Sequence, residues 1–330
     1  MNWTGTLKAA ALAAALSTGG LAAQAEVKIA LDTAPDLEGS GTYVWANSFA
    51  NYLNEHGMAA KEYPRGALGE EAEKLDQTSQ GLLEINMADV KSAGKLDPLI
   101  YGVYLPYLFA DIGHLDSTVA KGQLLDKVNA ATTPKGVRVL DIVALGSGAG
   151  IFNTKKPITG PDDMADLRMR ALDETQIKLF ESWGTKGTIV SWSEVPNALQ
   201  TGVADGYMNP AFVPLMFGHT DFIKHYTNAN MVPSTRLAIA SEDWYQGLSE
   251  ADRKIVDDAV LVAHDANRAW LKRTEPEMEG KLEAAGITVT RLTPAAREEF
   301  VTRSRKVYTD GVLAPEQVEI WVGAADAAKH

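Results

Sequence analysis

The side chains that most often carry out chemistry in proteins are sparse in this sequence and are not arranged for it. The 330 residues include no cysteine and six histidines. No two histidines stand four residues apart, the spacing that places two zinc ligands on one face of a helix. No G-x-S-x-G motif marks a serine nucleophile. We therefore expect no metal centre, no cofactor and no catalysis, and we expect surface or helix-capping roles for the histidines, which are His56, His114, His219, His225, His264 and His330.

Two other polar clusters do not form a recognisable reactive site. Residues 146–150 read Gly-Ser-Gly-Ala-Gly, which matches neither G-x-G-x-x-G nor the P-loop and lacks the lysine that would reach a phosphate. Glu70 and Glu71 are neighbours in a predicted helix, so their side chains point about 100° apart and do not face one site together. We interpret the glycine-rich segment as a bend between lobes and the two glutamates as the solvated first turn of a helix.

Aromatic residues are better candidates for contacts with a small molecule. Tyr101, Tyr104, Tyr107 and Phe109 cluster around a proline, and we expect most of them to fill the interior of a lobe. Trp192 stands where a predicted strand gives way to a helix. In open α/β sheets such junctions lie at the carboxyl ends of strands, where ligands bind. Trp192 is therefore expected to line a ligand site.

The composition restricts the class of protein that these residues serve. The net charge of −12 disfavours nucleic acids and anionic membrane surfaces, which require clustered lysine and arginine. It does not disfavour an anionic ligand held by one arginine in a dry cleft. Residues 1–25 contain an alanine- and leucine-rich stretch that closes on Ala23-Gln24-Ala25, which predicts a secretory signal peptide cleaved after Ala25. We expect a soluble protein of the bacterial periplasm.

The first part of the predicted mature chain alternates strand and helix patterns. Strands are predicted over residues 27–31, near residues 62–64 and over residues 83–87. The amphipathic helices between them end at Gly57 and Gly81. This β-α-β-α-β order predicts a parallel sheet covered by helices.

The same order returns after Gly150. A strand over residues 168–171, a helix over residues 175–183 and a strand over residues 187–190 are predicted from the same signals. Residues 191–194 read Ser-Trp-Ser-Glu, which predicts a capping box at the start of a further helix. A second α/β lobe is therefore expected to follow the first.

The last quarter of the chain is expected to be shared between the lobes. Residues 249–286 predict a long helical segment that bends or breaks near Pro276, where a backbone N–H is missing. A segment of this length could brace both lobes. The predicted boundaries are residues 26–147 and 235–274 for the first lobe, and residues 148–234 and 275–330 for the second.

Two blocks of the sequence carry a family resemblance. Residues 164–170 read Met-Ala-Asp-Leu-Arg-Met-Arg, and residues 192–210 read Trp-Ser-Glu-Val-Pro-Asn-Ala-Leu-Gln-Thr-Gly-Val-Ala-Asp-Gly-Tyr-Met-Asn-Pro. They resemble the L-R-x-R strand, the S-E-V-x-x-A-L-Q-x-G-x-x-D-G block and the following Asn-Pro of the solute-binding proteins of TRAP (tripartite ATP-independent periplasmic) transporters. Residues 64–70 and 105–109 are similar to that family's first-lobe helix start and its L-P-[FY]-L-F segment.

The resemblance implies a two-lobe periplasmic binding protein fold, type II-like, that closes on a small organic acid and passes it to a membrane permease. Arg170 matches the family's carboxylate-binding arginine, and a planar guanidinium suits that role because it offers two parallel N–H donors. Asn209 matches an amide that binds a ligand oxygen, and Trp192 matches an aromatic residue that packs on the ligand. We expect a monomer. The remaining residues that we expect to contact the ligand are Asp32, Glu70, Asp89 and Phe212.

One departure from the family pattern bears on the ligand. Many members carry a second arginine where this sequence has Ala149 or Gly150. The ligand is therefore expected to be a monocarboxylate, with an aromatic or hydroxylated remainder as further options. Two alternatives stay open: a zwitterionic or cationic solute that faces Asp32 or Asp89, and a receptor that reports to a signalling protein instead of feeding a permease.

Overall fold

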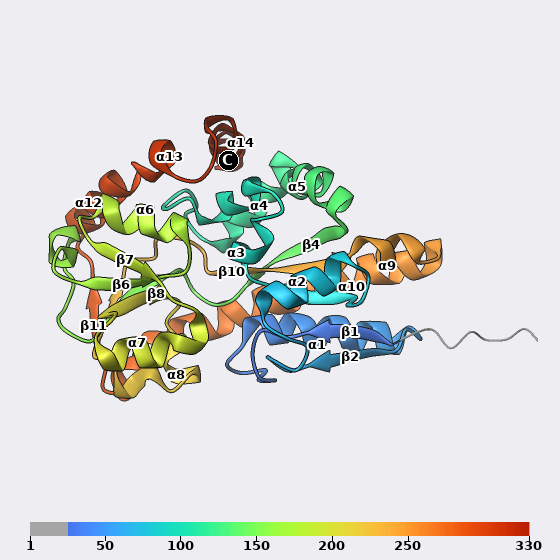
Figure 1. Ribbon diagram of the computed structural model, residues 1–330, viewed down its shortest axis with the longest axis horizontal. Coiled ribbons are helices and arrows are strands. Elements are labelled where there is room, and N and C mark those ends of the chain that lie inside the picture. The colour runs from blue at the N-terminus through green and yellow to red at the C-terminus, as the bar shows by residue number, and fades with distance from the viewer. Residues whose placement is uncertain (1–25, 330) are drawn as a thin grey trace, which may run out of the picture.

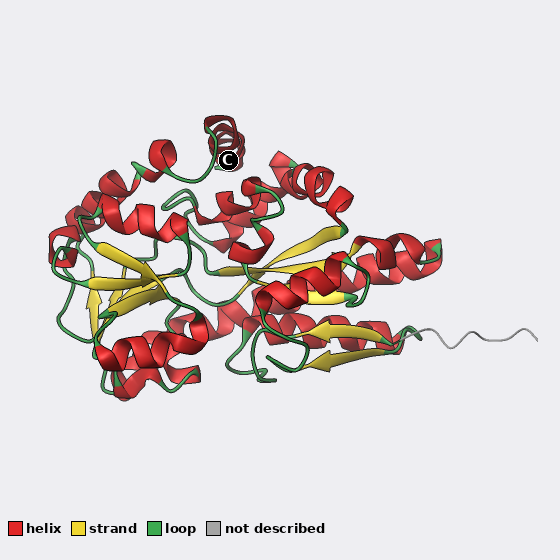
Figure 2. Cartoon of the chain, viewed as in Figure 1, coloured by secondary structure: helices red, strands yellow, loops and turns green. Residues whose placement is uncertain are grey.

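The computed structural model describes residues 26–329, so the predicted signal peptide over residues 1–25 lies outside the described residues. The chain forms two α/β lobes side by side, each built around one sheet with helices on its faces (Figures 1 and 2). The expected two-lobe α/β fold is confirmed.

The first lobe contains a five-stranded mixed sheet. Its strands lie in the order β2 (Ala60–Tyr63), β1 (Val27–Ala30), β3 (Ile85–Ala88), β10 (Thr235–Ser241) and β4 (Val137–Ala144). Strands β1, β2 and β3 are parallel, as the β-α-β-α-β pattern predicted, while β10 runs antiparallel between β3 and β4. The helices of this lobe are α1 (Gly41–Glu55), α2 (Glu71–Ser79), α3 (Val90–Ala93), α4 (Ile112–Gly122), α5 (Leu124–Thr132) and α9 (Glu242–Gly247).

The second lobe contains a six-stranded mixed sheet. Its strands lie in the order β11 (Thr288–Arg291), β9 (His225–Asn228), β5 (Gly150–Asn153), β8 (Gly206–Asn209), β6 (Arg168–Ala171) and β7 (Lys186–Ile189). Strand β5 is antiparallel to both of its neighbours, and β6, β7 and β8 are parallel to one another. The helices of this lobe are α6 (Glu174–Ser182), α7 (Val195–Thr201), α8 (Val213–Met216), α11 (Met278–Ala284), α12 (Pro294–Ser304) and α13 (Val307–Asp310).

Short 3₁₀ helices connect several of these elements. They are η1 (Pro98–Tyr104), η2 (Thr133–Lys135), η3 (Pro161–Met164), η4 (Trp192–Glu194), η5 (His219–Asp221) and η6 (Glu275–Glu277). The capping box expected at residues 191–194 is not formed, because Ser191 makes no side-chain capping hydrogen bond and bonds Ser193 instead. The following helix α7 begins only at Val195, with Pro196 in its first turn, a position where proline costs no hydrogen bond.

Two connecting segments cross between the lobes and are bonded to each other. One joins β4 to β5 through residues 145–149, which confirms the glycine-rich bend, and the other joins β9 to β10 through residues 229–234. Backbone N–H groups of Leu145 and Ala149 donate to the carbonyls of Ser234 and Val232, both at 2.9 Å. These paired segments are the natural place for a hinge.

A third connection is the long helix α10 (Glu250–Thr274), which packs against α1 and breaks before Pro276, where η6 leads into α11 of the second lobe. The side chain of Asn267 on α10 clamps the end of β4: its Oδ1 accepts from Ala144 N, and its Nδ2 donates to the Ala144 carbonyl. The expected long, broken helix is therefore present and is anchored beside the crossing segments (Figure 1).

The C-terminal helix α14 (Pro315–Ala328) differs from the expected division, which placed residues 275–330 as a whole in the second lobe. It packs on α4, and Trp321 is buried in the first-lobe core, where its Nε1 donates to the carbonyl of Leu99 at 2.8 Å. The sequence pattern marks the apolar face of this helix but does not indicate which lobe covers it.

Candidate ligand-binding cleft

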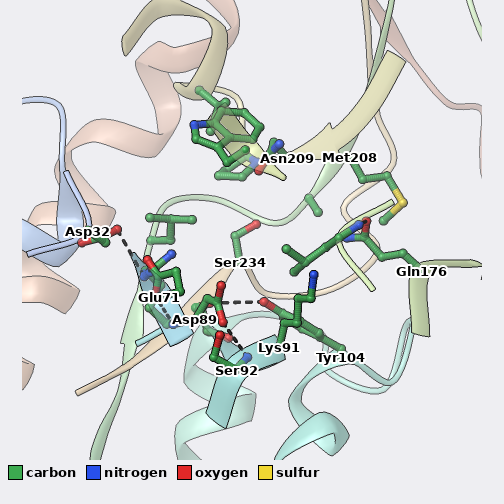
Figure 3. A pocket seen from close by; sticks show the side chains of 18 of the residues that line it. Asp32, Glu71, Asp89, Lys91, Ser92, Tyr104, Gln176, Met208, Asn209 and Ser234 are labelled. Atoms are coloured by element: carbon green, nitrogen blue, oxygen red, sulfur yellow. Dashed lines mark hydrogen bonds and ion pairs between the residues drawn. The ribbon is translucent and has the colours of Figure 1, made fainter. Parts of the chain in front are cut away.

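A cavity of about 580 Å³ lies between the two lobes. The first lobe lines it with residues that follow β1 and β3 and with the start of β10, while the second lobe lines it with the ends of β6 and β8. Figure 3 shows Asn209 and Met208 on one side of this space and Asp89, Lys91 and Ser92 on the other. Ligand sites of small molecules have this size and lie at such strand ends.

Arg170 is a buried cation without an anionic partner. It lies on β6 between β7 and β8, and only 4% of it is exposed. Its Nε donates to the carbonyl of Val190 at 3.0 Å, and its guanidinium carbon lies 5.5 Å from the ring centre of Trp192. Burial lowers the pKa of Arg170 to about 10, which leaves it protonated at neutral pH. Among residues 26–329, the carboxylates that most raise the pKa of Arg170 are those of Asp173 and Asp89, but neither forms an ion pair with it.

Asn209 presents a second unpaired donor to the cavity. It ends β8, the neighbour of β6, so Asn209 and Arg170 lie toward the same edge of the sheet. The Nδ2 atom of Asn209 is buried and has no hydrogen-bond partner within the described part of the chain. A buried amide N–H left unpaired costs about 1–3 kcal/mol. Together the guanidinium and the amide can bind the oxygens of a carboxylate.

An aromatic wall lies beside Arg170. Trp192 packs edge-to-face on Phe217, with ring centres 5.1 Å apart, and Phe212 lines the same cavity. Behind Trp192 lies His219, whose Nδ1 is 3.2 Å from the hydroxyl of the buried Tyr207. Burial lowers the pKa of His219, so it backs the wall as a neutral ring. This wall can hold the apolar part of a ligand.

The first-lobe side contains a buried group of four charges that balance one another. Arg236 lies 2.6 Å from Glu71 and 3.3 Å from Asp32, and Lys74 lies 3.3 Å from Glu71. Burial opposes ionisation of Glu71, but attraction to Arg236 and Lys74 outweighs it and holds the pKa of Glu71 at about 2. Asp32 also accepts a hydrogen bond from Thr42 at 2.7 Å. These charges are therefore already satisfied by the protein.

Asp89 and Glu70 occupy the same side of the cavity in different ways. Asp89 caps α3 by accepting from the backbone N–H of Ser92 at 2.6 Å, and it forms no ion pair among the described residues. Glu70 is exposed at the start of α2, where its backbone N–H donates to Glu73. Asp89 can thus face a ligand directly, whereas Glu70 lies at the mouth.

All seven residues expected to contact the ligand line this one cavity: Arg170, Asn209, Trp192 and Phe212 from the second lobe, and Asp32, Glu70 and Asp89 from the first. Their contact with a ligand stays a prediction. The structure also distinguishes Ala149 from Gly150, the two residues that could stand in place of the family's second arginine. Ala149 lines the cavity, while a side chain at Gly150 would meet the ring of Tyr226 at 2.3 Å.

Other lining residues were not singled out by the sequence. Glu71, expected in a solvated helix turn, is partly buried and paired with Arg236. Tyr104 packs against the first-lobe core, as expected, and also lines the cavity. Glu71 directly follows Glu70, a residue that the sequence does place at the site. No local pattern in the sequence indicates Arg236. Further residues missed in this way are Lys91, Gln176, Met208, Phe217, Ser234 and Thr235.

Two histidines are not the surface or capping groups expected. His219 is buried in the aromatic wall. His264 on α10 bonds Asp141 at 3.0 Å and lies 3.6 Å from Asp116, and its interactions with these two accepting carboxylates raise the pKa of His264 to about 9. Over the described residues, no group of three or more histidines and carboxylates could hold a metal ion. In the same range, no helix is both long and apolar enough to cross a membrane.

Comparison with known proteins gives consistent results. Residues 35–312 match the family described as bacterial extracellular solute-binding protein, family 7. The chain is 27% identical to the ectoine-binding periplasmic protein TeaA of Halomonas elongata, over 82% of this chain and 81% of that protein. It is 29% identical to the sialic acid-binding periplasmic protein SiaP of Vibrio cholerae, over 86% of each. The high-resolution structure of the periplasmic ectoine-binding protein of Halomonas elongata matches 92% of this chain and 99% of its own, at 25% identity and a TM-score of 0.81.

Proposed function

Because this chain belongs to family 7 of the bacterial extracellular solute-binding proteins, the receptors of TRAP transporters, we propose that its ligand is a small organic acid held between the two lobes. Proteins of this family bind small solutes and work with membrane permease components, and they are not enzymes. The proposal therefore concerns the ligand of this receptor and the residues that bind it.

One observation supports an acid above all: the cleft contains a buried guanidinium that no protein carboxylate neutralises. A buried charge is costly unless it is paired. Arg170 is 4% exposed and lacks such a partner among residues 26–329, while the unpaired Nδ2 of Asn209 lines the same cavity. A ligand carboxylate would satisfy both groups at once.

Among the described residues, the second lobe offers a single guanidinium, that of Arg170, to a ligand carboxylate. Ala149, where many relatives carry an arginine, has no donor to offer, and Arg236 is already engaged by Glu71 and Asp32. The aromatic wall of Trp192 and Phe212 suits an apolar or ring-shaped remainder. We therefore propose a monocarboxylate, and the named ligands of two similar proteins, sialic acid and D-erythronate, are also acids.

A zwitterionic solute is the second candidate, and it rests on Asp89. Asp32 is occupied by Arg236 and Thr42, whereas Asp89 lines the cavity without an ion pair in the described structure. A cationic group of the ligand would have to meet Asp89. The ectoine-binding relative makes ectoine the appropriate probe for this reading.

We propose that binding closes the lobes about the paired crossing segments over residues 145–149 and 229–234. Arg170 and Asn209 would engage the acid from the second lobe, and first-lobe residues would then select the remainder. The mature protein is proposed to begin after Ala25, to act as a monomer in the periplasm and to deliver the acid to a TRAP permease.

A thermal-shift screen of the purified protein tests the proposal, because a ligand that binds only the native state raises the melting temperature. The panel contains D-erythronate, D-glucuronate, sialic acid, succinate, butyrate, benzoate and ectoine, with erythritol as an uncharged control. We expect at least one acid to raise the melting temperature and erythritol to leave it unchanged. Stabilisation by the uncharged compound alone would contradict the proposal.

A further inference from the structure

On the first-lobe side, Arg236 and Lys74 are paired with protein carboxylates. Lys91 has no such partner among the described residues. Lys91 lies on α3 and lines the cavity. In Figure 3 its side chain extends from α3 into the space between the lobes, on the side of Gln176 and away from Asp32. Over residues 26–329, its ammonium makes no hydrogen bond and no ion pair.

The backbone of Lys91 is nevertheless held firmly. Its carbonyl accepts a hydrogen bond from the hydroxyl of Tyr101 at 3.1 Å, and Asp89 caps the short helix by accepting from Ser92 N. Val90, Ser92 and Ala93 around it are buried. The backbone that carries Lys91 is thus held in place, and its ammonium is available to a ligand in the cleft.

The charges of the cleft favour an anionic ligand. Asp32 and Glu71 are balanced by Arg236 and Lys74, with which they form ion pairs. Glu70 and Lys95 are exposed at the mouth. What remains is one carboxylate, that of Asp89, against the cations of Arg170, Lys91 and the half-buried Arg65, whose Nη1 donates only to the backbone carbonyl of Asp32 at 3.2 Å. The cleft therefore carries an excess of positive charge, which an anionic ligand offsets.

Asp89 and Lys91 also offer an acceptor and a donor to a ligand on the first-lobe side of the cavity. Asp89 caps the helix on which Lys91 lies, and both side chains line the cavity. A ligand hydroxyl can accept from an ammonium and donate to a carboxylate, whereas a second ligand carboxylate would be repelled by Asp89. The pair is therefore chemically matched to a hydroxyl group.

We propose that Lys91 is a specificity-determining residue that binds a hydroxyl oxygen of the ligand, so that the cleft selects hydroxylated monocarboxylates over unsubstituted acids of equal length. This inference rests on the proposed function, since it assumes that Arg170 holds the carboxylate. It assigns recognition of the part of the ligand beyond the carboxylate to the first lobe. There Lys91 would donate a hydrogen bond to the ligand hydroxyl, and Asp89 would accept one from it.

The test is isothermal titration calorimetry with three four-carbon acids, D-erythronate, butyrate and succinate, on the wild type, Lys91→Met and Lys95→Met. Methionine keeps most of the length of lysine and removes its charge. Lys95→Met is the matched control, because Lys95 also lines the cavity but is exposed at its mouth. Far-UV circular dichroism and the melting temperature of each free variant check folding, with Lys91→Gln as a second variant.

We expect wild type to bind D-erythronate more tightly than butyrate and succinate. Lys91→Met should weaken D-erythronate by at least tenfold, as expected for a lost charged hydrogen bond, and change butyrate by less than threefold. Lys95→Met should change both acids by less than threefold. Equal effects of Lys91→Met on D-erythronate and butyrate, or no effect on either, would overturn the proposal for Lys91 while leaving Arg170 untouched. If none of the three acids binds wild type, this inference fails, and the wider thermal-shift panel then decides the proposed function separately.

Discussion

Replacing Arg170 by methionine should weaken ligand binding without destabilising the free protein. Most substitutions of a buried, bonded residue destabilise a protein. Arg170 should differ because its burial in the free protein is unfavourable, as the lowered pKa of about 10 indicates. A residue that costs stability until its ligand arrives is expected at a binding site.

The magnitude follows from the pKa. A fall from 12.5 to about 10 corresponds to about 3 kcal/mol of destabilisation of the charged form on folding, at 1.36 kcal/mol for each unit. Methionine removes that cost but also loses the hydrogen bond to Val190 and the contact with Trp192, worth about 1–2 kcal/mol together. The free variant should therefore be as stable as wild type or more stable by about 1–2 kcal/mol, a rise of a few degrees.

Binding should change in the opposite direction. The guanidinium can make two charged hydrogen bonds to a carboxylate, each worth about 1.5–3 kcal/mol, so affinity should fall by at least tenfold. Calorimetry with the acid that most stabilises wild type measures this fall, and thermal unfolding of the free proteins measures stability. Arg168→Met is the control for affinity, because Arg168 lies on the same strand with its side chain 54% exposed and paired with Asp205 outside the cavity.

Two results would refute the reasoning. Unchanged affinity in Arg170→Met would show that the guanidinium does not bind the ligand. A melting temperature far below that of wild type in the free variant would show that Arg170 is a structural residue, whatever its effect on binding.

Three further predictions concern stability. Glu71→Gln should destabilise the free protein by about 2–4 kcal/mol in urea unfolding, because it leaves the buried Arg236 underpaired; a loss below 0.5 kcal/mol would contradict the charge balance. The pKa of His264 is raised to about 9 from 6.5, so the stabilisation of the fold by protonated His264 is complete below pH 6.5 and is lost as the pH rises through 9. The melting temperature of wild type should therefore fall over this range, and His264→Gln should flatten the fall. Gly206→Ala would place a Cβ atom 2.0 Å from the carbonyl of Phe152 and should cost about 1–3 kcal/mol, while Gly247→Ala, at a site with open space, should cost far less.

Much of the fold could be predicted from local signals. Glycines such as Gly57 and Gly81, both with positive φ in the structure, mark helix ends in the sequence because other residues are strained there. The apolar periodicity of the intervening segments then fixes strand or helix. The break near Pro276 follows in the same way from the missing N–H.

The candidate site was only partly predictable. Arg170 and Asn209 lie in sequence blocks that a family resemblance singles out, so the sequence alone points to them. The pairing of Arg236 with Glu71 joins residues 165 positions apart and depends on β10 lying antiparallel beside β3. No local pattern encodes such a pairing. Whether the ammonium of Lys91 is paired depends on the residues that surround it in the folded cleft, so the sequence alone does not reveal it.

A crystal structure of the protein with the acid that most stabilises it tests the central claim most directly. We predict that the ligand lies between the lobes with its carboxylate on the guanidinium of Arg170 and an oxygen within hydrogen-bond distance of Asn209 Nδ2. A ligand bound elsewhere, or one whose carboxylate points away from Arg170, would contradict the account.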